Sequence, residues 1–125
     1  MCKIECEVVI VVQINGMKEM RINPTRGVNE MIKVVAKAKL KPGVSVEDYL
    51  IQAKELVAET RKEEGCITYA LHQDINDSSI VTMLEEWVDE ESLNQHNQTE
   101  HVKRIVPGLR ELRESSEINI YREVE

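Results

Sequence analysis

The sequence predicts an α+β fold in which helices cover one face of an antiparallel sheet. Three observations support this prediction. Residues 31–39 and 80–88 have strand-like patterns, residues 45–64 repeat apolar side chains at helical spacing, and turn-forming segments separate these stretches. From residue 31 the elements follow the order strand, helix, strand, strand, helix, strand. This is the order of the split βαβ, ferredoxin-like arrangement with a four-stranded sheet.

Composition narrows the class of protein further. The chain has 125 residues, which fits one domain with a real core, and it carries a net charge of −7. A protein that binds nucleic acid needs a basic surface, so we expect no nucleic-acid partner. The longest apolar run, Val8–Val12, is too short to span a membrane, and the first residues lack the features of a signal peptide. We therefore expect a cytoplasmic protein with no membrane partner.

Residues 1–30 are predicted to be an N-terminal extension, ahead of a domain at 31–125. The stretch from Lys3 to Ile14 is rich in β-forming residues, and Asn15-Gly16 is a strong signal for a tight hairpin turn. Residues 17–22 would form the return strand. This segment is expected to be a hairpin arm, either a partner-binding strand or sequence upstream of a domain that is complete from Met31.

The first strand and helix of the domain are the clearest elements. Alternate residues of 31–39 are apolar, which predicts a half-exposed strand: Ile32, Val34, Ala36 and Ala38. Ser45 and Asp48 have the spacing of a capping box, so a helix is expected to begin after Ser45. Gly65 is expected to end that helix.

The second half of the domain should begin with a hairpin of strands at 66–74 and 80–88. Within the first of these, Ile67, Tyr69 and Leu71 are expected on one face, with Cys66 and His72 on the other. Asp89 and Thr99 look like N-caps, which predicts helices at about 90–97 and from 100 onward. Pro107-Gly108 is expected to kink or interrupt the second of these helices. The last strand is expected at 117–124.

The predicted layers leave one face of the sheet without a cover. Helices can pack on only one face, and the other face still carries apolar residues. We therefore expect a homodimer in which a second copy covers the open face.

The segment 80–102 gathers the residues most suited to chemistry. It holds the only tryptophan, Trp87, and two of the three histidines, His96 and His101. His96 lies three residues after Leu93, so both should face the sheet. A metal site is not expected, because His96 and His101 are five residues apart, which is poor spacing for two ligands on one helix. Cys2 and Cys6 alone are also weak evidence for zinc.

Three stretches together resemble the antibiotic biosynthesis monooxygenase superfamily. They are residues 62–66 running to Tyr69, residues 80–87, and residues 96–101 (HNQTEH). The spacing is most similar to the small quinol monooxygenases of that superfamily, over about residues 31–124. The resemblance implies a dimeric α/β barrel. It also implies oxidation of a quinol or similar small aromatic by O₂ without metal, flavin or other cofactor.

The resemblance also suggests roles for individual residues. His96 is the candidate base, because an imidazole with a pKa of about 6.5 suits proton transfer near neutral pH. Tyr69 is the candidate phenol donor to a bound oxygen. The remaining candidates would shape the ligand pocket: Trp87, His101, Asn94 and Glu85.

Each candidate also has a structural interpretation, and the reaction itself stays open. His96 and Tyr69 could be core residues, Trp87 could pack in the core or at a dimer interface, and Glu85 could form a salt bridge. One alternative activity is an isomerase or detoxifying enzyme acting on a small carbonyl or enol metabolite. A second alternative is a small-ligand-binding dimer without turnover.

Overall fold

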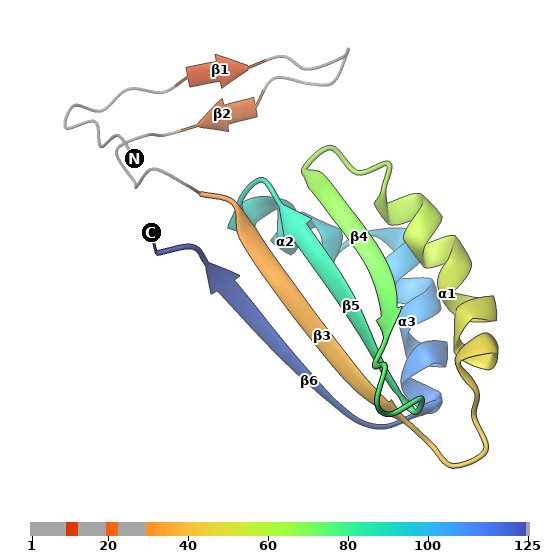
Figure 1. Ribbon diagram of the computed structural model, residues 1–125. Coiled ribbons are helices and arrows are strands. Elements are labelled where there is room, and N and C mark those ends of the chain that lie inside the picture. Colours follow the sequence, from red (N-terminus) through yellow and green to blue (C-terminus); the bar gives the residue numbers. More distant parts are fainter. Residues whose placement is uncertain (1–9, 13–19, 23–29, 125) are drawn as a thin grey trace.

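The computed structural model describes residues 10–12, 20–22 and 30–124. Residues 30–124 form the α+β domain that the sequence predicts (Figure 1). Its strands are β3 (Ile32–Leu40), β4 (Cys66–Gln73), β5 (Ile80–Trp87) and β6 (Arg113–Arg122). Its helices are α1 (Val46–Thr60), α2 (Glu90–His96) and α3 (Glu100–Glu111).

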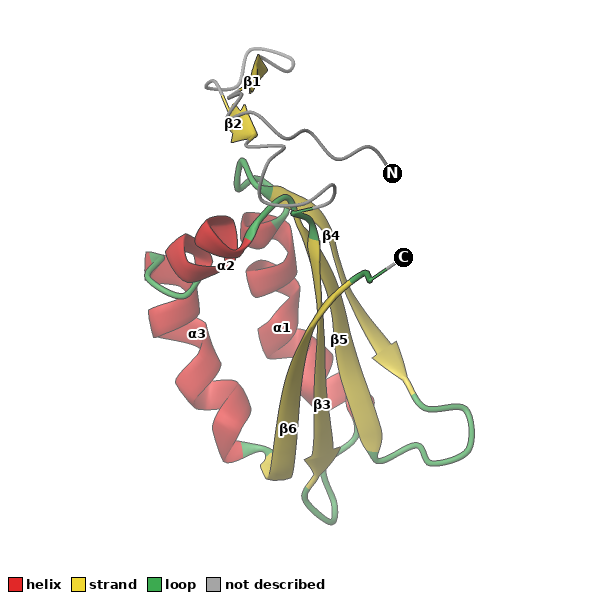
Figure 2. Ribbon diagram, turned by 90° about the vertical axis from the view of Figure 1, so that its left-hand side faces the viewer, coloured by secondary structure: helices red, strands yellow, loops and turns green. Residues whose placement is uncertain are grey.

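The four strands form one antiparallel sheet in the order β4-β5-β3-β6. The central strands β3 and β5 are separated in the sequence by α1 and β4, and the edge strand β6 returns beside β3 after α2 and α3. This is the ferredoxin-like topology, so the predicted fold is confirmed. Figure 2 shows all three helices on the same side of the sheet.

Alternation along β3 and β5 explains why the helices pack on that side. Apolar residues of β3 face the helices, while Lys33 and Lys37 lie on the open face. On β5, Val81, Met83 and Trp87 are buried against the helices, and Trp87 is completely buried. Burying alternate apolar side chains of two central strands supplies the hydrophobic free energy that holds the layers together.

Helix α1 begins as predicted but ends earlier. Ser45 caps it: the Asp48 backbone N–H donates to the Ser45 hydroxyl, and the Asp48 carboxylate accepts the Ser45 backbone N–H. The helix ends at Thr60, so the prediction that Gly65 terminates it is wrong. Gly65 instead lies where the chain passes close to α2, and a Cβ there would overlap the side chain of Ser92. The glycine is required for this close approach.

Strand β4 contains an irregularity that the sequence did not reveal. Its pairing with β5 shifts between Cys66 and Thr68, so Ile67 is an extra residue and is exposed. Cys66 therefore packs against the core, on the side of Trp87, and the predicted assignment of Cys66 and Ile67 to faces is wrong. His72 is exposed on the open face of the sheet, as predicted.

Two further boundaries differ from the prediction. Helix α3 continues through Pro107 without a break. Pro107 has no backbone N–H, so the helix lacks the hydrogen bond to the carbonyl group of Lys103. Both residues are exposed, so water can solvate the freed carbonyl group. Strand β6 begins at Arg113 rather than at residue 117, because pairing with β3 recruits the polar residues 113–116 into the sheet.

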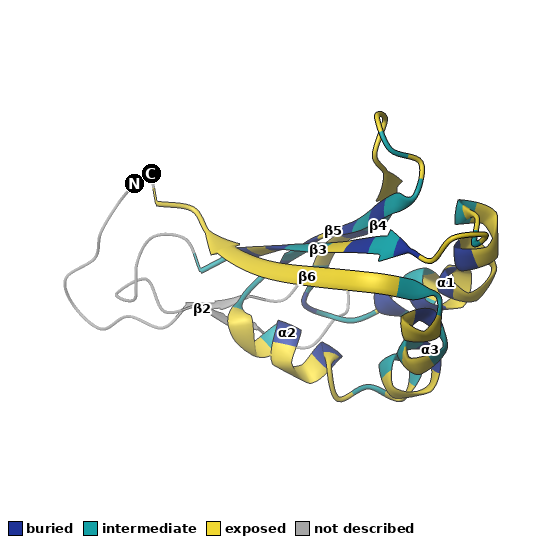
Figure 3. Cartoon of the chain, turned by 90° about the horizontal axis from the view of Figure 1, so that it is seen from below, coloured by how far each residue is buried: buried dark blue, intermediate teal, exposed yellow. Residues whose placement is uncertain are grey.

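The edge strand β6 is largely exposed in this chain (Figure 3). Val35, Leu84 and Tyr121 lie on the open face, and Ile118 and Ile120 of β6 are exposed on the helix side. The described part of the chain thus presents apolar side chains on both sides of its sheet.

Within the N-terminal segment, β1 (Ile10–Val12) and β2 (Met20–Ile22) pair as antiparallel strands. The predicted hairpin turn at Asn15-Gly16, and Cys2 and Cys6, lie outside the described residues. Among the described helices, none is long and apolar enough to cross a membrane.

The packing of Gly65 against α2 can be tested by substitution. Gly65→Ala should lower the free energy of unfolding by about 1–3 kcal/mol, because the added methyl group overlaps the Ser92 side chain. Urea denaturation measures this change. A second substitution, Ser92→Gly, should recover part of the loss caused by the first.

Gly108→Ala is the matched control. A Cβ at Gly108 would meet only the end of the flexible Gln52 side chain, which can move aside. Alanine also favours the helical state, so this variant should be as stable as the wild type or slightly more so. Equal destabilisation by both alanines would contradict the close approach at Gly65.

Candidate active site

A cavity of about 400 Å³ lies between the helix side of the sheet and the helices. Much of its wall is apolar and comes from β3, β5, α2 and α3, including Val34, Met83, Leu93, Val102 and Val106. A smaller group of polar residues also lines it: Lys37, Tyr49, Tyr69, Glu85, His96, Asn97, Arg110, Arg113 and Ser116. A cavity of this size with few polar groups is typical of a site for a small organic ligand.

His96 is the last residue of α2 and contacts the aromatic side of the cavity. The Asp89 carboxylate caps α2, and Leu93 anchors it to the core one turn before His96. The His96 ring lies 4.7 Å from the Trp87 ring and 5.4 Å from the Tyr69 ring, measured between centroids. His96 is only 5% exposed, so its orientation is fixed by packing.

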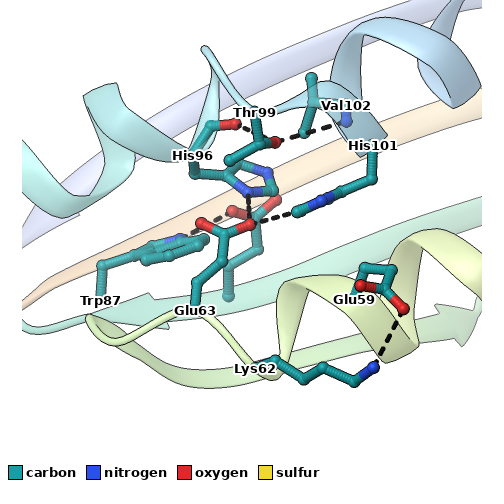
Figure 4. A network of polar contacts seen from close by, with 9 residues as sticks. Glu59, Lys62, Glu63, Trp87, His96, Thr99, His101 and Val102 are labelled. Carbon is teal, nitrogen blue, oxygen red and sulfur yellow. Dashed lines mark hydrogen bonds and ion pairs between the residues drawn. The ribbon is translucent and has the colours of Figure 1, made fainter. Parts of the chain in front are cut away.

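Glu63 joins His96 to the second histidine, His101 (Figure 4). Glu63 follows the end of α1, and one oxygen of its carboxylate, Oε2, lies 2.8 Å from His96 Nδ1 and 2.6 Å from His101 Nε2. The two histidines belong to different helices, because α2 ends at His96 and α3 begins at Glu100. The Thr99 hydroxyl caps α3 and also donates to the His96 carbonyl, 2.7 Å away.

The shared carboxylate determines which nitrogen of each ring carries a proton. A carboxylate can only accept hydrogen bonds, so His96 Nδ1 and His101 Nε2 must both donate to it. A neutral His96 then has an unprotonated Nε2. Burial lowers the pKa of His96 from its ordinary value, and the interaction with Glu63 opposes this only in part. The His96 ring is therefore neutral at pH 7, with Nε2 available as a base.

Glu85 lies beside this group, on the helix side of β5. Its carboxyl oxygen Oε1 accepts a hydrogen bond of 2.9 Å from the Trp87 indole N–H. Burial raises the pKa of Glu85 to about 7, although the Trp87 bond lowers it and the charge of Glu63 raises it further. Tyr69 lies directly across from Glu85 on β4. Burial and the nearby Glu85 charge raise the pKa of Tyr69, so its phenol remains a hydrogen-bond donor.

A cationic group reaches the cavity from the start of β6. Arg113 Nε donates a hydrogen bond of 3.0 Å to the Tyr49 hydroxyl, and the guanidinium lies 5.9 Å from the centre of the Tyr49 ring. The cavity therefore combines a neutral base, a phenol donor and a fixed positive charge. That combination suits a ligand that loses a proton and becomes an anion.

Comparison with known proteins shows what this chain is similar to. The sequence profile of the family described as antibiotic biosynthesis monooxygenase matches residues 31–108. The chain belongs to this family. The "Putative monooxygenase YcnE" of Bacillus subtilis (strain 168) is 37% identical over 82 residues, which cover 66% of this chain and 85% of that protein.

Solved structures of relatives share the fold. The crystal structure of a conserved protein from Methanosarcina mazei Go1 is 47% identical, with a TM-score of 0.72, and the match covers 75% of this chain and 93% of that one. A second crystal structure, described as an antibiotic biosynthesis monooxygenase, is 32% identical with a TM-score of 0.69. That match covers 75% of this chain and 99% of the other. The described domain thus carries the fold of the family.

The structure brings together most of the residues that the sequence singled out. Tyr69, Glu85 and His96 of this family member line the cavity. Trp87 lies behind them, fully buried against His96, and His101 reaches Glu63 from the start of α3. Glu85 forms no salt bridge among the described residues.

Asn94, which the sequence suggested as a pocket residue, is exposed on α2 and does not line the cavity. Sequence reasoning overlooked Glu63, Asn97 and Arg113. Glu63 belongs to the 62–66 stretch that carries the resemblance, but it is one of two adjacent glutamates there, and nothing in the sequence distinguishes it from Glu64. No sequence signal placed Arg113 at the cavity, because its strand was expected to begin later.

The pKa of Glu85 predicts a pH dependence of stability. Its value of about 7 lies above the 4.5 of an exposed glutamate, so its stabilising contribution is present below about pH 4.5 and is lost as the pH rises through 7. Glu85→Gln keeps an oxygen for the Trp87 N–H and carries no charge. At pH 8 it should raise the free energy of unfolding by up to about 3 kcal/mol, with little effect at pH 4.5.

Urea denaturation at the two pH values gives the comparison, with Glu86→Gln as control. Glu86 lies on the opposite face of the same strand, 3.5 Å from Lys33 Nζ, and is only partly buried. Its substitution should give no pH-dependent gain. A gain from Glu85→Gln that is the same at both pH values would argue against a protonated Glu85.

Proposed function

We propose that this family member is a cofactor-independent monooxygenase that oxidises a quinol or a similar small aromatic with O₂. The observation that carries the proposal is the position of His96. Glu63 holds its Nδ1–H, so Nε2 is the nitrogen left for a ligand in a mostly apolar cavity. A neutral buried imidazole next to a cavity is suited to general-base catalysis.

The proposed reaction starts with a proton transfer. Nε2 of His96 takes the proton of a quinol hydroxyl, and the resulting anion gives one electron to O₂. Superoxide and the ring radical then combine to form a C–O bond, and the proton from His96 completes a hydroperoxide. Loss of water leaves a carbonyl, so quinol and O₂ give a hydroxyquinone and one water. The quinol supplies all four electrons, and no separate reductant is needed.

The other polar groups would stabilise the charge that develops. The Tyr69 phenol is a donor for an anionic oxygen, and Arg113 provides a fixed positive charge. In a mostly apolar cavity such interactions are stronger than in bulk water, which favours the anion that reacts with O₂. The same base could move a proton on an enol or carbonyl compound, and oxygen consumption separates the two reactions.

We also propose that two copies of the chain associate through the open face of the sheet. Leu84 and Val35 lie at the centre of that face, and Tyr121 lies on its edge strand. An apolar patch on an antiparallel sheet is commonly covered in a homo-oligomer. Lys33 and Lys37 on the same face would then need acidic partners, and Glu86 and Glu117 lie within the same surface.

Oxygen uptake tests the proposed reaction. Metal-free, flavin-free protein should consume O₂ with a panel of hydroquinones, and His96→Ala should reduce the rate by about 100-fold or more, because it removes the base. His72→Ala is the control, since His72 is exposed on the opposite face of the sheet. Turnover that survives in His96→Ala would remove His96 from the mechanism.

Sedimentation tests the proposed association. Leu84→Glu places a charge at the centre of the open face and should convert a dimer to a folded monomer, because the burial of an unpaired charge is costly. The control is Ile51→Glu, since Ile51 is 74% exposed on α1 and lies on the helix side. A wild-type chain that sediments as a monomer, or equal effects of both substitutions, would contradict this interface.

A further inference from the structure

Glu63, His96 and His101 bring three metal-ligating atoms to one point. One atom from each side chain lies within 4.8 Å of the other two. The rings come from α2 and α3, and the carboxylate comes from the turn after α1 (Figure 4). The five-residue spacing of His96 and His101 is unsuitable for a metal site only if both residues lie on a single helix. The break between α2 and α3 removes that condition, because the two rings approach Glu63 from different helices.

We propose that these three residues form a binding site for a divalent transition-metal ion of the zinc type, and that the ion controls the base. Two imidazoles and one carboxylate are the ligands of many zinc sites with an open fourth position. A site with one carboxylate is poorly suited to Ca²⁺ or Mg²⁺, which take mainly oxygen ligands.

The three ligand atoms would have to shift to accept the ion. With Zn–N and Zn–O bonds of about 2.0–2.1 Å at tetrahedral angles, neighbouring ligand atoms lie about 3.3 Å apart. The two nitrogen-to-oxygen distances are 2.8 and 2.6 Å, and all three atoms fall within 4.8 Å. The carboxylate oxygen would therefore withdraw by roughly half an ångström, and the two nitrogens, which lie within 4.8 Å of each other, would approach by up to about 1.5 Å. Rotation of the three side chains can supply these shifts.

The surroundings hold the ligands in place but leave a path for the ion. The side chain of His96 is 6% exposed, whereas those of His101 and Glu63 are 14% and 16% exposed. The Thr99 hydroxyl fixes the junction between the two helices by bonding the His96 carbonyl and capping α3. The site is thus preorganised by outer contacts and reachable from the side of His101 and Glu63.

Metal binding has a direct consequence for His96. The ion would replace the hydrogen on Nδ1, and the single proton of the neutral ring would then reside on Nε2. Nε2 would change from an acceptor to a donor, so it could no longer take a proton from a ligand. No net proton is released by this change of tautomer. The control of activity rests on the proposed function, but the binding of the ion does not.

Zinc binding to the metal-free full chain tests the site. We would measure it by isothermal titration calorimetry in a Cys2→Ser, Cys6→Ser, Cys66→Ser background, so that thiols cannot bind the ion. We expect one Zn²⁺ per chain, and a loss of affinity of about tenfold or more in His101→Ala and in Glu63→Gln. Co²⁺ should give the visible absorption bands of tetrahedral coordination, and these should disappear in both variants.

His72→Ala is the matched control, because His72 is exposed on the opposite face of the sheet and does not belong to the three-residue cluster. It should bind Zn²⁺ like its parent. Circular dichroism checks that each variant is folded, and Glu63→Gln, which keeps its shape, remains informative if His101→Ala unfolds. The proposal is overturned if Zn²⁺ does not bind, or if it binds equally well to the site variants and to His72→Ala.

Oxygen uptake provides the second measurement. In the wild-type chain Zn²⁺ should suppress the rate, and in His101→Ala the ratio of rates with and without Zn²⁺ should be closer to one. Faster uptake with Zn²⁺ or another divalent ion would overturn the control of the base. If no substrate is oxidised while Zn²⁺ binds with the expected variant pattern, the proposed function fails and the metal site stands.

Discussion

One oxygen of the Glu63 carboxylate accepts hydrogen bonds from two imidazoles that arrive on different helices. This contact fixes the turn after α1 to the junction of α2 and α3, and thereby joins the two halves of the helix layer. It also selects the tautomer of His96. The arrangement therefore serves packing and chemistry at once, because the side chain that orients the base also connects elements that are distant in the sequence.

Packing and chemistry are also combined in the core, on the helix side of the sheet. Trp87 is completely buried, yet its indole N–H donates to Glu85, which lines the cavity. A buried carboxyl group normally destabilises a core unless it is neutral or paired. Here the indole supplies one hydrogen bond and burial favours the neutral acid, so the core tolerates a polar group beside the site.

The periodic parts of the fold could be predicted from the sequence, because alternation in residues 32–40 and capping at Ser45 are local signals. The remaining features of the fold depend on contacts between residues that are distant in the sequence. The sequence pattern predicts that Gly65 ends a helix, and only the close approach of α2 shows why a glycine is needed there. The extra residue at Ile67 and the early start of β6 at Arg113 depend on pairing with a neighbouring strand.

The same distinction holds for the site. His96, Tyr69 and Glu85 could be chosen because they lie in the stretches that resemble the family, on a helix and strands that the sequence predicts. Glu63 could not be chosen on those grounds, since it lies in a turn whose path is set by the packing of α1. Its partnership with His101 spans 38 residues, and no local pattern reports such a contact.

Strand β6 forms one wall of the cavity and is also an edge of the sheet. Ile118 and Ile120 line the cavity although they are 62% and 55% exposed in this chain. Their side chains contribute little to the packed core, so their size could change during evolution at small cost in stability. Tyr69, Glu85 and His96 are buried on other elements, whereas Arg113 belongs to β6 itself. Substitutions at Ile118 and Ile120 would therefore change the shape of the cavity without disturbing the packed core around His96.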